Sequence, residues 1–412
     1  MRLNDLLSVG NLFLKLGDKM KSLIKTTAGL VLSATMATAS FGANVNIGEL
    51  EGFTGPIESM AGPMSLGANL AVTEANASGK YLQGTLVVFS GDSTCVDAAA
   101  ATSEAERLIN DHNVMAIMGP NCSGATQAVI DSVSVPNGIL TISNAATAPS
   151  LSDAKDGGLF FRTSPSDTVQ AAVLAEVALA RGITDMAVTH ENGDYGKGLA
   201  DSFVTQYTAL GGTVSIVAAH ENDKADYSAD VAALSAGGST TLAVFGYADT
   251  GGKGILTASE DTGAFTDYVF ADGMMSTTVS GLVADGSWGT MPAPSADLAA
   301  AWATVATAGG VDPGGVFTGE SYDAMALIIL ASQAAGSTDS VAMAAEVMGI
   351  ANAPGIECFA GELGTCLKYI SGGLEVDYVG AIGINFNAVG EQMGSYAERE
   401  IIGGEFTTVA SH

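Results

Sequence analysis

Two runs of small polar residues, each directly after an apolar stretch, carry the groups in this sequence best suited to chemistry. Gly119–Gln127 follows Met115–Met118, and Ser143–Pro149 follows Ile139–Ile142. Small residues let a ligand approach the backbone, and ligands bind at the carboxyl ends of parallel strands. These two turns offer hydroxyls and free amides but no strong nucleophile and no metal ligand. They therefore favour binding of a small polar molecule over catalysis.

Motifs that would indicate an enzyme are missing from the sequence. Gly119 and Gly124 have the glycine spacing of a phosphate-binding loop, but the Lys-Ser/Thr pair of such a loop does not follow. There is no Gly-x-Ser-x-Gly nucleophile elbow. The four histidines do not cluster, although His190 beside Glu191 leaves an acid–base pair as an alternative. We predict no enzymatic activity, no cofactor and no metal.

Residues 1–43 have the features of a signal-peptide region. Three lysines between residues 19 and 25 precede a small apolar run at Thr26–Thr38, and small residues then fit a cleavage site near Ala39 to Ala43. Either Met1 or Met20 could be the initiator. An uncleaved anchor is the alternative, but the apolar run is shorter than a membrane span. We expect a mature protein exported to the periplasm.

The chain is strongly acidic, with 44 Asp and Glu residues against 15 Lys and Arg and a formal net charge of −29 at pH 7. Loss of the basic leader makes the mature protein more negative still. Charge repulsion excludes nucleic acid and anionic membrane surfaces as partners. Because the acidic residues are spread over the whole chain, they indicate a hydrated surface and do not identify a cationic ligand.

Four cysteines suit an exported, oxidising environment, in which an even count favours disulfides. Three connectivities are possible. We predict Cys95 with Cys122 and Cys358 with Cys366, because each pair lies within one region of the chain. A metal site is the alternative, but neither spacing is Cys-x-x-Cys and no histidine lies nearby.

From Val45 onwards, short apolar runs alternate with amphipathic stretches. Strands are predicted at Val45–Leu50, Thr85–Phe89, Val114–Met118, Ile139–Ile142, Met186–His190, Val214–Ala218, Leu242–Phe245 and Tyr268–Ala271. Helices are predicted at Ser65–Ala77, Asp97–Asp111, Ser123–Val133, Asp167–Ala180, Gly196–Leu210, Ser228–Ala236, Gly252–Thr262 and Ser321–Ala335. This alternation indicates right-handed βαβ crossovers and parallel sheets.

The series runs twice, which predicts an α/β chain with two Rossmann-like lobes, each built on a parallel central sheet. Phe160–Pro165 is an extended connector between the lobes, Thr290–Pro294 is a further crossing, and the β-rich run Val376–Asn387 is expected to help complete the first lobe. We place the N-terminal lobe at residues 44–164 and 292–386, and the C-terminal lobe at residues 165–291 and 387–412.

Several short motifs occur in a fixed order along the chain. They are Gly55-Pro56, Gly119-x-x-Cys122-Ser123-x-x-Thr126-Gln127, Ser143-x-Ala145-Ala146-Thr147-x-Pro149, Asp194-Tyr195-Gly196-x-Gly198-Leu199-Ala200, Gly246-Tyr247 and an acidic residue, Asp272, after the strand ending at Ala271. Each is weak alone. Together they resemble the periplasmic substrate-binding proteins of branched-chain amino-acid (Leu/Ile/Val-type) ABC transporters, over essentially the whole chain from Val45.

The resemblance implies a type I periplasmic binding fold, or Venus flytrap, in which three hinge crossings join the lobes and ligand binds in the cleft between them. In such proteins the two turns hold the ligand carboxylate. Carried over, Ser123 and Thr147 would offer hydroxyls, the Ala145 carbonyl would accept from the ligand ammonium, and Ala146 would line the same wall. A zwitterion taken out of water needs a partner for each of its two charges, because an unpaired buried charge is costly. Separate groups for the carboxylate and the ammonium meet this requirement.

The second lobe supplies the opposite wall in this resemblance. Tyr195 and Tyr247 would close over the ligand, and Asp272 would pair with its ammonium. Two departures affect which substrate is bound. Asp272 stands where the family usually has the longer Glu, and Met60 stands where it commonly has an aromatic residue. Methionine is flexible, so the pocket is expected to accept varied side chains.

The function expected is an extracytoplasmic receptor that captures a small amino acid, or an amino-acid-like zwitterion, and delivers it to a membrane permease, acting as a monomer. One alternative is the same fold tuned to an aromatic acid, a urea or amide, or a polyamine. Another is a ligand-sensing module that docks to a membrane receptor. A periplasmic hydrolase is the remaining possibility.

Overall fold

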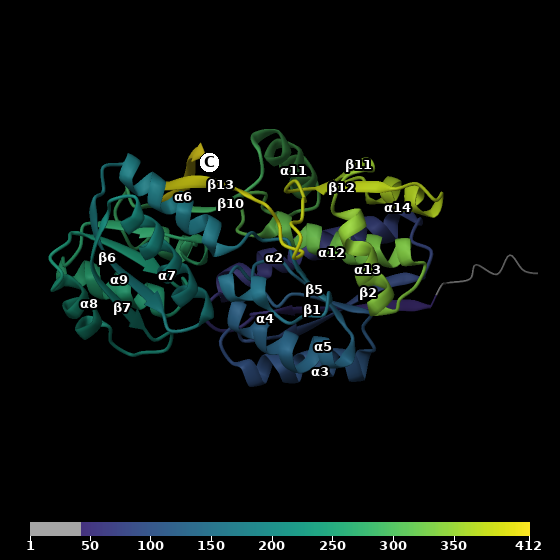
Figure 1. Ribbon diagram of the computed structural model, residues 1–412, viewed down its shortest axis with the longest axis horizontal. Helices are drawn as coiled ribbons and strands as arrows, with labels where there is room; N and C mark the ends of the chain where they lie inside the picture. Colours follow the sequence, from purple (N-terminus) through teal and green to yellow (C-terminus); the bar gives the residue numbers. More distant parts are fainter. Residues whose placement is uncertain (1–42) are drawn as a thin grey trace, which may run out of the picture. The chain divides into compact units, whose positions relative to one another are not determined.

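The computed structural model describes residues 43–412 of the chain, so the predicted signal peptide and its cleavage lie outside the described residues. The first sheet is wholly parallel, in the order β2-β1-β3-β4-β5. Figure 1 labels β1, β2 and β5 of this sheet. Its strands are β1 (Asn44–Glu51), β2 (Thr85–Asp92), β3 (Ala116–Met118), β4 (Leu140–Ser143) and β5 (Phe160–Arg162). The sequence predicts only an extended connector at Phe160–Pro165. In the structure Phe160–Arg162 pair with β4 as strand β5, and the side chains of Phe160 and Phe161 are buried.

Helices on this sheet follow its strands in the chain. They are α2 (Glu58–Ser78), α3 (Ala98–His112), α4 (Ser123–Val129), a π turn η1 (Ile130–Ser134), α5 (Val135–Asn137) and a 3-10 turn η2 (Pro149–Asp153). Asp97 caps α3, since its carboxylate accepts from the amides of Ala99 and Ala100. Helix α2 begins at Glu58, seven residues before its predicted start at Ser65, and contains Pro63.

The second sheet has seven strands, in the order β14-β13-β10-β9-β8-β6-β7. They are β6 (Asp185–Glu191), β7 (Thr213–His220), β8 (Thr241–Phe245), β9 (Asp267–Phe270), β10 (Trp288–Ala293), β13 (Ser395–Ile402) and β14 (Glu405–Ser411). Strands β6 to β10 are parallel, whereas β13 and β14 add an antiparallel edge. Its helices are α6 (Asp167–Ala180), α7 (Asp194–Ala209), α8 (Ser228–Ser235), α9 (Gly251–Thr262), η3 (Asp272–Met274) and α10 (Thr277–Ser280).

The last third of the chain is more helical than its pattern predicts. It holds α11 (Ala296–Ala308), α12 (Thr318–Ala335), α13 (Ser340–Ile350) and α14 (Leu363–Ser371), with β11 (Ile356–Phe359) and β12 (Val376–Gly380). Helix α12 is buried along most of its length and packs on α2, in one core with the first sheet. The run near residue 376 does not extend that sheet, because β12 pairs only with β11.

The chain crosses between the two sheets three times: between β5 and α6, between β10 and α11, and between β12 and β13. The chain therefore has the expected α/β architecture of two lobes joined by three crossings. Within the described residues, no helix combines the length and the apolar composition that a membrane crossing requires.

Candidate functional site

The two polar turns found in the sequence lie side by side at the ends of β3 and β4. Gly119 begins the first turn with φ +97°, and a Cβ there would overlap the Leu50 carbonyl oxygen. The Ser143 hydroxyl donates to the Pro120 carbonyl at 2.5 Å, which ties the second turn to the first. The Ser123 hydroxyl accepts from the Ala148 amide at 3.1 Å. The turns thus form one hydrogen-bonded wall.

A fully buried arginine supports the second turn from behind. Arg162 donates from Nη1 to the carbonyls of Ala146 and Ala148, both at 3.0 Å, and its Nη2 lies 2.6 Å from Glu391 Oε1. The Ser164 hydroxyl also donates to the Ala146 carbonyl. The backbone of Ala146 is therefore occupied by contacts inside the first lobe.

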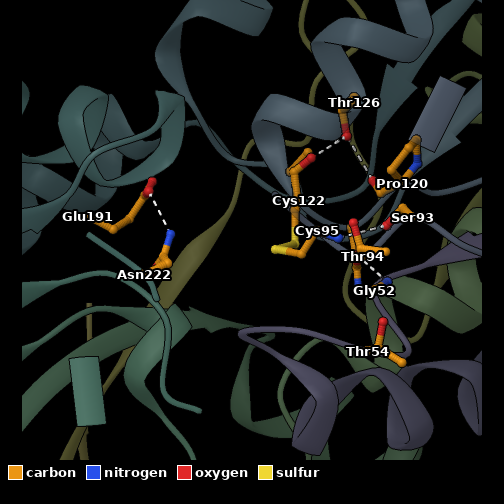
Figure 2. Close-up of a disulfide and its surroundings, with 12 residues drawn as sticks. Gly52, Thr54, Ser93, Thr94, Cys95, Pro120, Cys122, Thr126, Glu191 and Asn222 are labelled. Atoms are coloured by element: carbon orange, nitrogen blue, oxygen red, sulfur yellow. Dashed lines mark hydrogen bonds between the residues drawn. A yellow bond between two sulfur atoms is a disulfide. The ribbon is translucent and has the colours of Figure 1, made fainter. Parts of the chain in front are cut away.

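The predicted Cys95–Cys122 disulfide is present and joins the loop after β2 to the first polar turn (Figure 2). The Thr126 hydroxyl, one helical turn further, donates to the carbonyls of Pro120 and Cys122. The second predicted pair is not bonded in this structure. Cys358 and Cys366 are both buried free thiols, and the Cys366 thiol donates to the carbonyl of Glu362, the residue that precedes its helix.

Two tyrosines and one aspartate from the second lobe form the opposite wall. Tyr195 lies at the start of α7 and Tyr247 just after β8, with their rings stacked 5.1 Å apart. The Tyr195 hydroxyl donates to Asp272 Oδ1 at 2.9 Å and accepts from the Gly273 amide at 3.1 Å. Burial raises the pKa of Asp272 to about 6, partly offset by the Tyr195 hydrogen bond.

Both walls line one small cavity of about 20 Å³, roughly the space of a single water. Six of the eight predicted ligand residues line it: Met60, Ser123, Ala145, Tyr195, Tyr247 and Asp272. Ile57, Met64, Asn121, Gly273 and Phe317 complete it. Ala146 and Thr147 do not line it; both are buried behind the wall. The structure thus brings most of the predicted residues together.

A second carboxyl, which the sequence reasoning missed, lies beside Asp272. Asp167 begins α6, is fully buried, and neither of its carboxyl oxygens has a hydrogen-bond partner among the described residues. Burial, and next the charge of Asp272, raise the pKa of Asp167 well above its usual value. Asp272 Oδ2, Thr147 Oγ1 and Gln170 Oε1 are likewise buried without a partner. Unsatisfied acceptors therefore gather behind this part of the cavity.

The sequence offered one weak sign of Asp167. It follows Ser164-Pro165-Ser166 at a helix start, where an acidic residue ordinarily only stabilises the helix dipole. Nothing local predicts its approach to Asp272, which is 105 positions later and belongs to another strand–helix unit.

The mouth of the cleft is acidic. A wider cavity of about 390 Å³ shares Tyr247 with the small one and is lined by carboxyl groups together with the disulfide loop. These carboxyl groups belong to Glu191, Asp194, Glu221 and Asp223. Burial raises the pKa of Glu191 despite a hydrogen bond from the Gly196 amide. An anion approaching through this mouth meets several like charges.

The lobes touch directly at the rim of the cleft. The Asp249 amide donates to the Pro56 carbonyl at 3.1 Å, and the Ser59 amide donates to Asp249 Oδ2 at 2.8 Å. The hydroxyls of Ser59 and Ser276 lie 3.1 Å apart. Since Asp249 and Ser276 belong to the second lobe, these contacts hold the cleft closed.

Comparison with known proteins gives a consistent result. Residues 44–364 match the model of a family described as periplasmic binding protein. Over 333 residues the chain is 29% identical to Leu/Ile/Val-binding protein homolog 3 of Brucella melitensis, covering 79% of this chain and 89% of that protein. A crystal structure of a leucine binding protein from Thermotoga maritima is similar with a TM-score of 0.73 at 21% identity, covering 89% of this chain and 98% of that one. A solute binding protein from R. palustris in complex with 4-hydroxybenzoate has a TM-score of 0.72 at 17% identity, covering 90% and 97%.

Proposed function

Because this chain belongs to the periplasmic binding protein family, we propose that it is the extracytoplasmic receptor of an ABC importer and binds an aliphatic amino acid between its lobes. Delivery to a membrane permease and export to the periplasm are part of the proposal. So is the lobe division at residues 44–164 with 292–386 and 165–291 with 387–412. Relatives named as Leu/Ile/Val-binding proteins support it.

One observation carries the choice of ligand: a buried carboxyl faces neutral donors across the same cavity. Asp272 is only 3% exposed and keeps one carboxyl oxygen without a partner, so it suits an ammonium group. Ser123 and the polar turns supply hydroxyl and amide groups for a carboxylate. The side chains of Ile57, Met60, Met64 and Phe317 offer an apolar surface to the rest of the ligand.

Binding must be coupled to motion of the lobes. The cavity of about 20 Å³ is far below the volume that ordinary ligand sites offer, so admitting an amino acid requires the walls to separate. The ligand then stabilises the closed form by contacting both walls, which is the differential affinity that a conformational switch requires.

An aromatic acid is the second candidate, because a structural relative is in complex with 4-hydroxybenzoate. The charges here disfavour it. A ligand with a carboxylate but no ammonium would leave Asp272 unpaired and would enter through an acidic mouth.

Calorimetric titration of the mature chain tests the proposal. We expect saturable binding of leucine, isoleucine or valine, and weaker binding of the matched amine and acid that each lack one charge, isopentylamine and 4-methylpentanoate for leucine. Tighter binding of 4-methylpentanoate or 4-hydroxybenzoate than of any amino acid would contradict an ammonium-binding role for Asp272.

A further inference from the structure

A second cavity lies where the two lobes join, separate from the proposed amino-acid site. Its volume is about 200 Å³, and it shares no lining residue with the small cavity of the cleft. The end of β10 and strand β13 line it from the second lobe, and α11 and the start of α12 line it from the first. Much of the wall is apolar, including Met291, Pro294, Pro313 and Ile382.

Arg399 on β13 places a positive charge on this wall, and no carboxylate of the described residues pairs with it. Its Nη2 donates to the Phe406 carbonyl at 2.7 Å, its Nη1 faces the Met291 sulfur at 3.2 Å, and its Nε has no partner. No Asp or Glu of the described residues forms an ion pair with it. By contrast, the other three arginines of the described chain all do so: Arg107, Arg162 and Arg181.

The absence of a partner carboxylate is notable because this chain carries 44 acidic residues. Burial lowers the pKa of Arg399, and only the charge of Asp312 acts in the opposite direction. Asp312 itself accepts from the Gly314 amide and is not within ion-pair distance of the guanidinium. A half-buried guanidinium in this state is stabilised by any anion that reaches it.

Trp302 on α11 adds a second donor without an acceptor. Its side chain is 4% exposed, it lines the cavity, and its Nε1–H has no hydrogen-bond partner among the described residues. An indole N–H can only donate, and when buried it is normally paired. Nε1 lies 3.6 Å from the position that a Cβ on Gly319 would take, so this donor faces the first turn of α12.

The start of α12 presents a further donor to the same space. Phe317 precedes the helix in a left-handed conformation and makes no capping hydrogen bond through its side chain. Gly319 and Glu320 both line the cavity; the Glu320 amide donates to the carboxyl of its own side chain, whereas no acceptor among the described residues takes the Gly319 amide hydrogen. The first amides of a helix carry partial positive charge and suit a negative group.

The one carboxyl on the cavity wall, that of Glu320, does not cancel the excess of donors and positive charge. Burial raises the pKa of Glu320 to about 8, so the group is mostly neutral at pH 7. The wall therefore combines a guanidinium, an indole N–H and one free helix amide with an apolar remainder.

We propose that this cavity binds a small monocarboxylate with an apolar body, its carboxylate held by Arg399, Trp302 and the Gly319 amide at the start of α12. The apolar body lies along Met291, Pro294, Pro313 and Ile382. Because both lobes supply donors, the bound acid bridges them. The volume of about 200 Å³ limits it to a molecule smaller than an ordinary drug-sized ligand.

Titration of the mature chain with hexanoate tests the proposal, with hexan-1-ol and hexylamine as matched probes that lack the negative charge. We expect saturable binding of hexanoate to a single site, about tenfold or more tighter than of either control. Arg399→Met, which keeps a flexible apolar stem, should weaken hexanoate binding about 10- to 100-fold. Trp302→Phe, which keeps the ring but removes the N–H, should weaken it about 3- to 10-fold.

Two further variants separate this site from the cleft. Asp272→Ala alters the proposed amino-acid site and should leave hexanoate binding unchanged. Ala299→Leu adds bulk at an exposed position of the cavity wall and should block hexanoate, with an unaltered thermal unfolding temperature as the check on folding. No saturable hexanoate binding, equal binding of hexylamine, or unchanged binding by a folded Arg399→Met variant would each overturn the proposal. A failure of the chain to bind leucine would not overturn the proposal, because leucine binding tests only the site in the cleft.

Discussion

The Tyr195 hydroxyl donates to Asp272 Oδ1 at 2.9 Å and leaves Oδ2 without a partner among the described residues. The tyrosine therefore fixes the orientation of the carboxyl while one oxygen stays available. A carboxyl positioned in this way can accept from an ammonium without first breaking a hydrogen bond, and it avoids the entropy loss of ordering a mobile side chain.

Amino-acid affinity should depend on pH through Asp272. Burial raises its pKa to about 6, so below pH 6 a proton must leave before an ammonium can pair with the carboxylate. We expect log affinity to rise by up to about one unit per pH unit below pH 6 and to level off above about pH 7. Calorimetry across this range measures it.

Asp272→Asn is the control for that pH dependence. It should weaken binding about 10- to 100-fold at pH 7, because a charged hydrogen bond is lost, and its affinity should be flat with pH. A slope that persists in the variant would assign the titration to another group, such as Asp167.

Tyr195→Phe should weaken amino-acid binding about 3- to 10-fold without abolishing it. The ring stacks on Tyr247 as before, but Asp272 loses the donor that orients it. Losing that hydrogen bond also moves the pKa of Asp272 further upward, so the midpoint of the pH dependence should shift to higher pH. A midpoint that stays in place while affinity falls would mean that the hydroxyl contacts the ligand itself.

Closure of the cleft should depend on Asp249, which touches no part of the small cavity. Its carboxylate accepts from the Ser59 amide across the cleft and from the Thr278 hydroxyl on its own side. Asp249→Ala removes the bridge and should weaken amino-acid binding about 3- to 30-fold, because the closed form becomes less populated. Faster dissociation in stopped-flow fluorescence is the signature.

Asp261→Ala is the matched control for that measurement, since it removes an exposed aspartate from the same lobe away from the cleft. If the two substitutions changed binding equally, the effect of Asp249→Ala would come from the change in net charge and not from loss of the bridge across the cleft.

Removing the disulfide should destabilise the first lobe and disturb the turn that carries Ser123. Cys95 and Cys122 are 27 residues apart, for which chain entropy gives an upper estimate of about 3.5 kcal/mol. Thr94 and Cys95 both have positive φ, so this loop holds a conformation that L-residues rarely adopt. We expect a lower melting temperature and weaker amino-acid binding for the Cys95→Ser/Cys122→Ser variant.

A reducing agent should reproduce that loss of stability in the natural chain and leave the variant unchanged. The buried thiols of Cys358 and Cys366 provide the internal comparison, because a reductant has no bond to cleave there.

Local sequence patterns predicted most of the strands and the chemistry of the turns, because these depend on neighbours in the chain. The apolar strand before Gly119 and the small residues after it are visible in one short run. Other features depend on contacts between distant segments. Asp167 has the pattern of an ordinary helix-start residue, and only the packing of α6 on β10 brings it near Asp272. Arg399 has the pattern of a surface strand residue, and only the pairing of β13 with β10 places it on a cavity wall.

The burial of the acidic residues of β1 likewise depends on distant segments and could not be predicted from the local sequence pattern. Acidic side chains are ordinarily exposed to solvent, but Glu49 and Glu51 are both fully buried. Glu49 accepts from the Ser90 hydroxyl at 2.7 Å and Glu51 from the Asn144 side chain at 2.8 Å. Alternation along a strand shows which residues share a face, but it does not show that a helix such as α2 covers that face.

Glu320 should make the chain less stable as pH rises. Its carboxyl keeps a proton to about pH 8 when folded, against an ordinary value of 4.5, so the folded state binds the extra proton between these limits. The free energy of unfolding therefore falls as pH increases through this window. Glu320→Gln removes the ionisation and should raise stability at pH 8 to 9 by on the order of 1 kcal/mol, with little change at pH 5. Asp323→Asn is the contrasting variant. Burial also raises the pKa of Asp323, to about 7, but its carboxyl oxygens accept from the Tyr378 hydroxyl and the Ala381 and Ile382 amides, so replacing one oxygen with an amide NH2 should lower stability at both pH values. Thermal unfolding at both pH values distinguishes the two, and equal destabilisation by both substitutions would show that Glu320 is held as a structural hydrogen-bonding group.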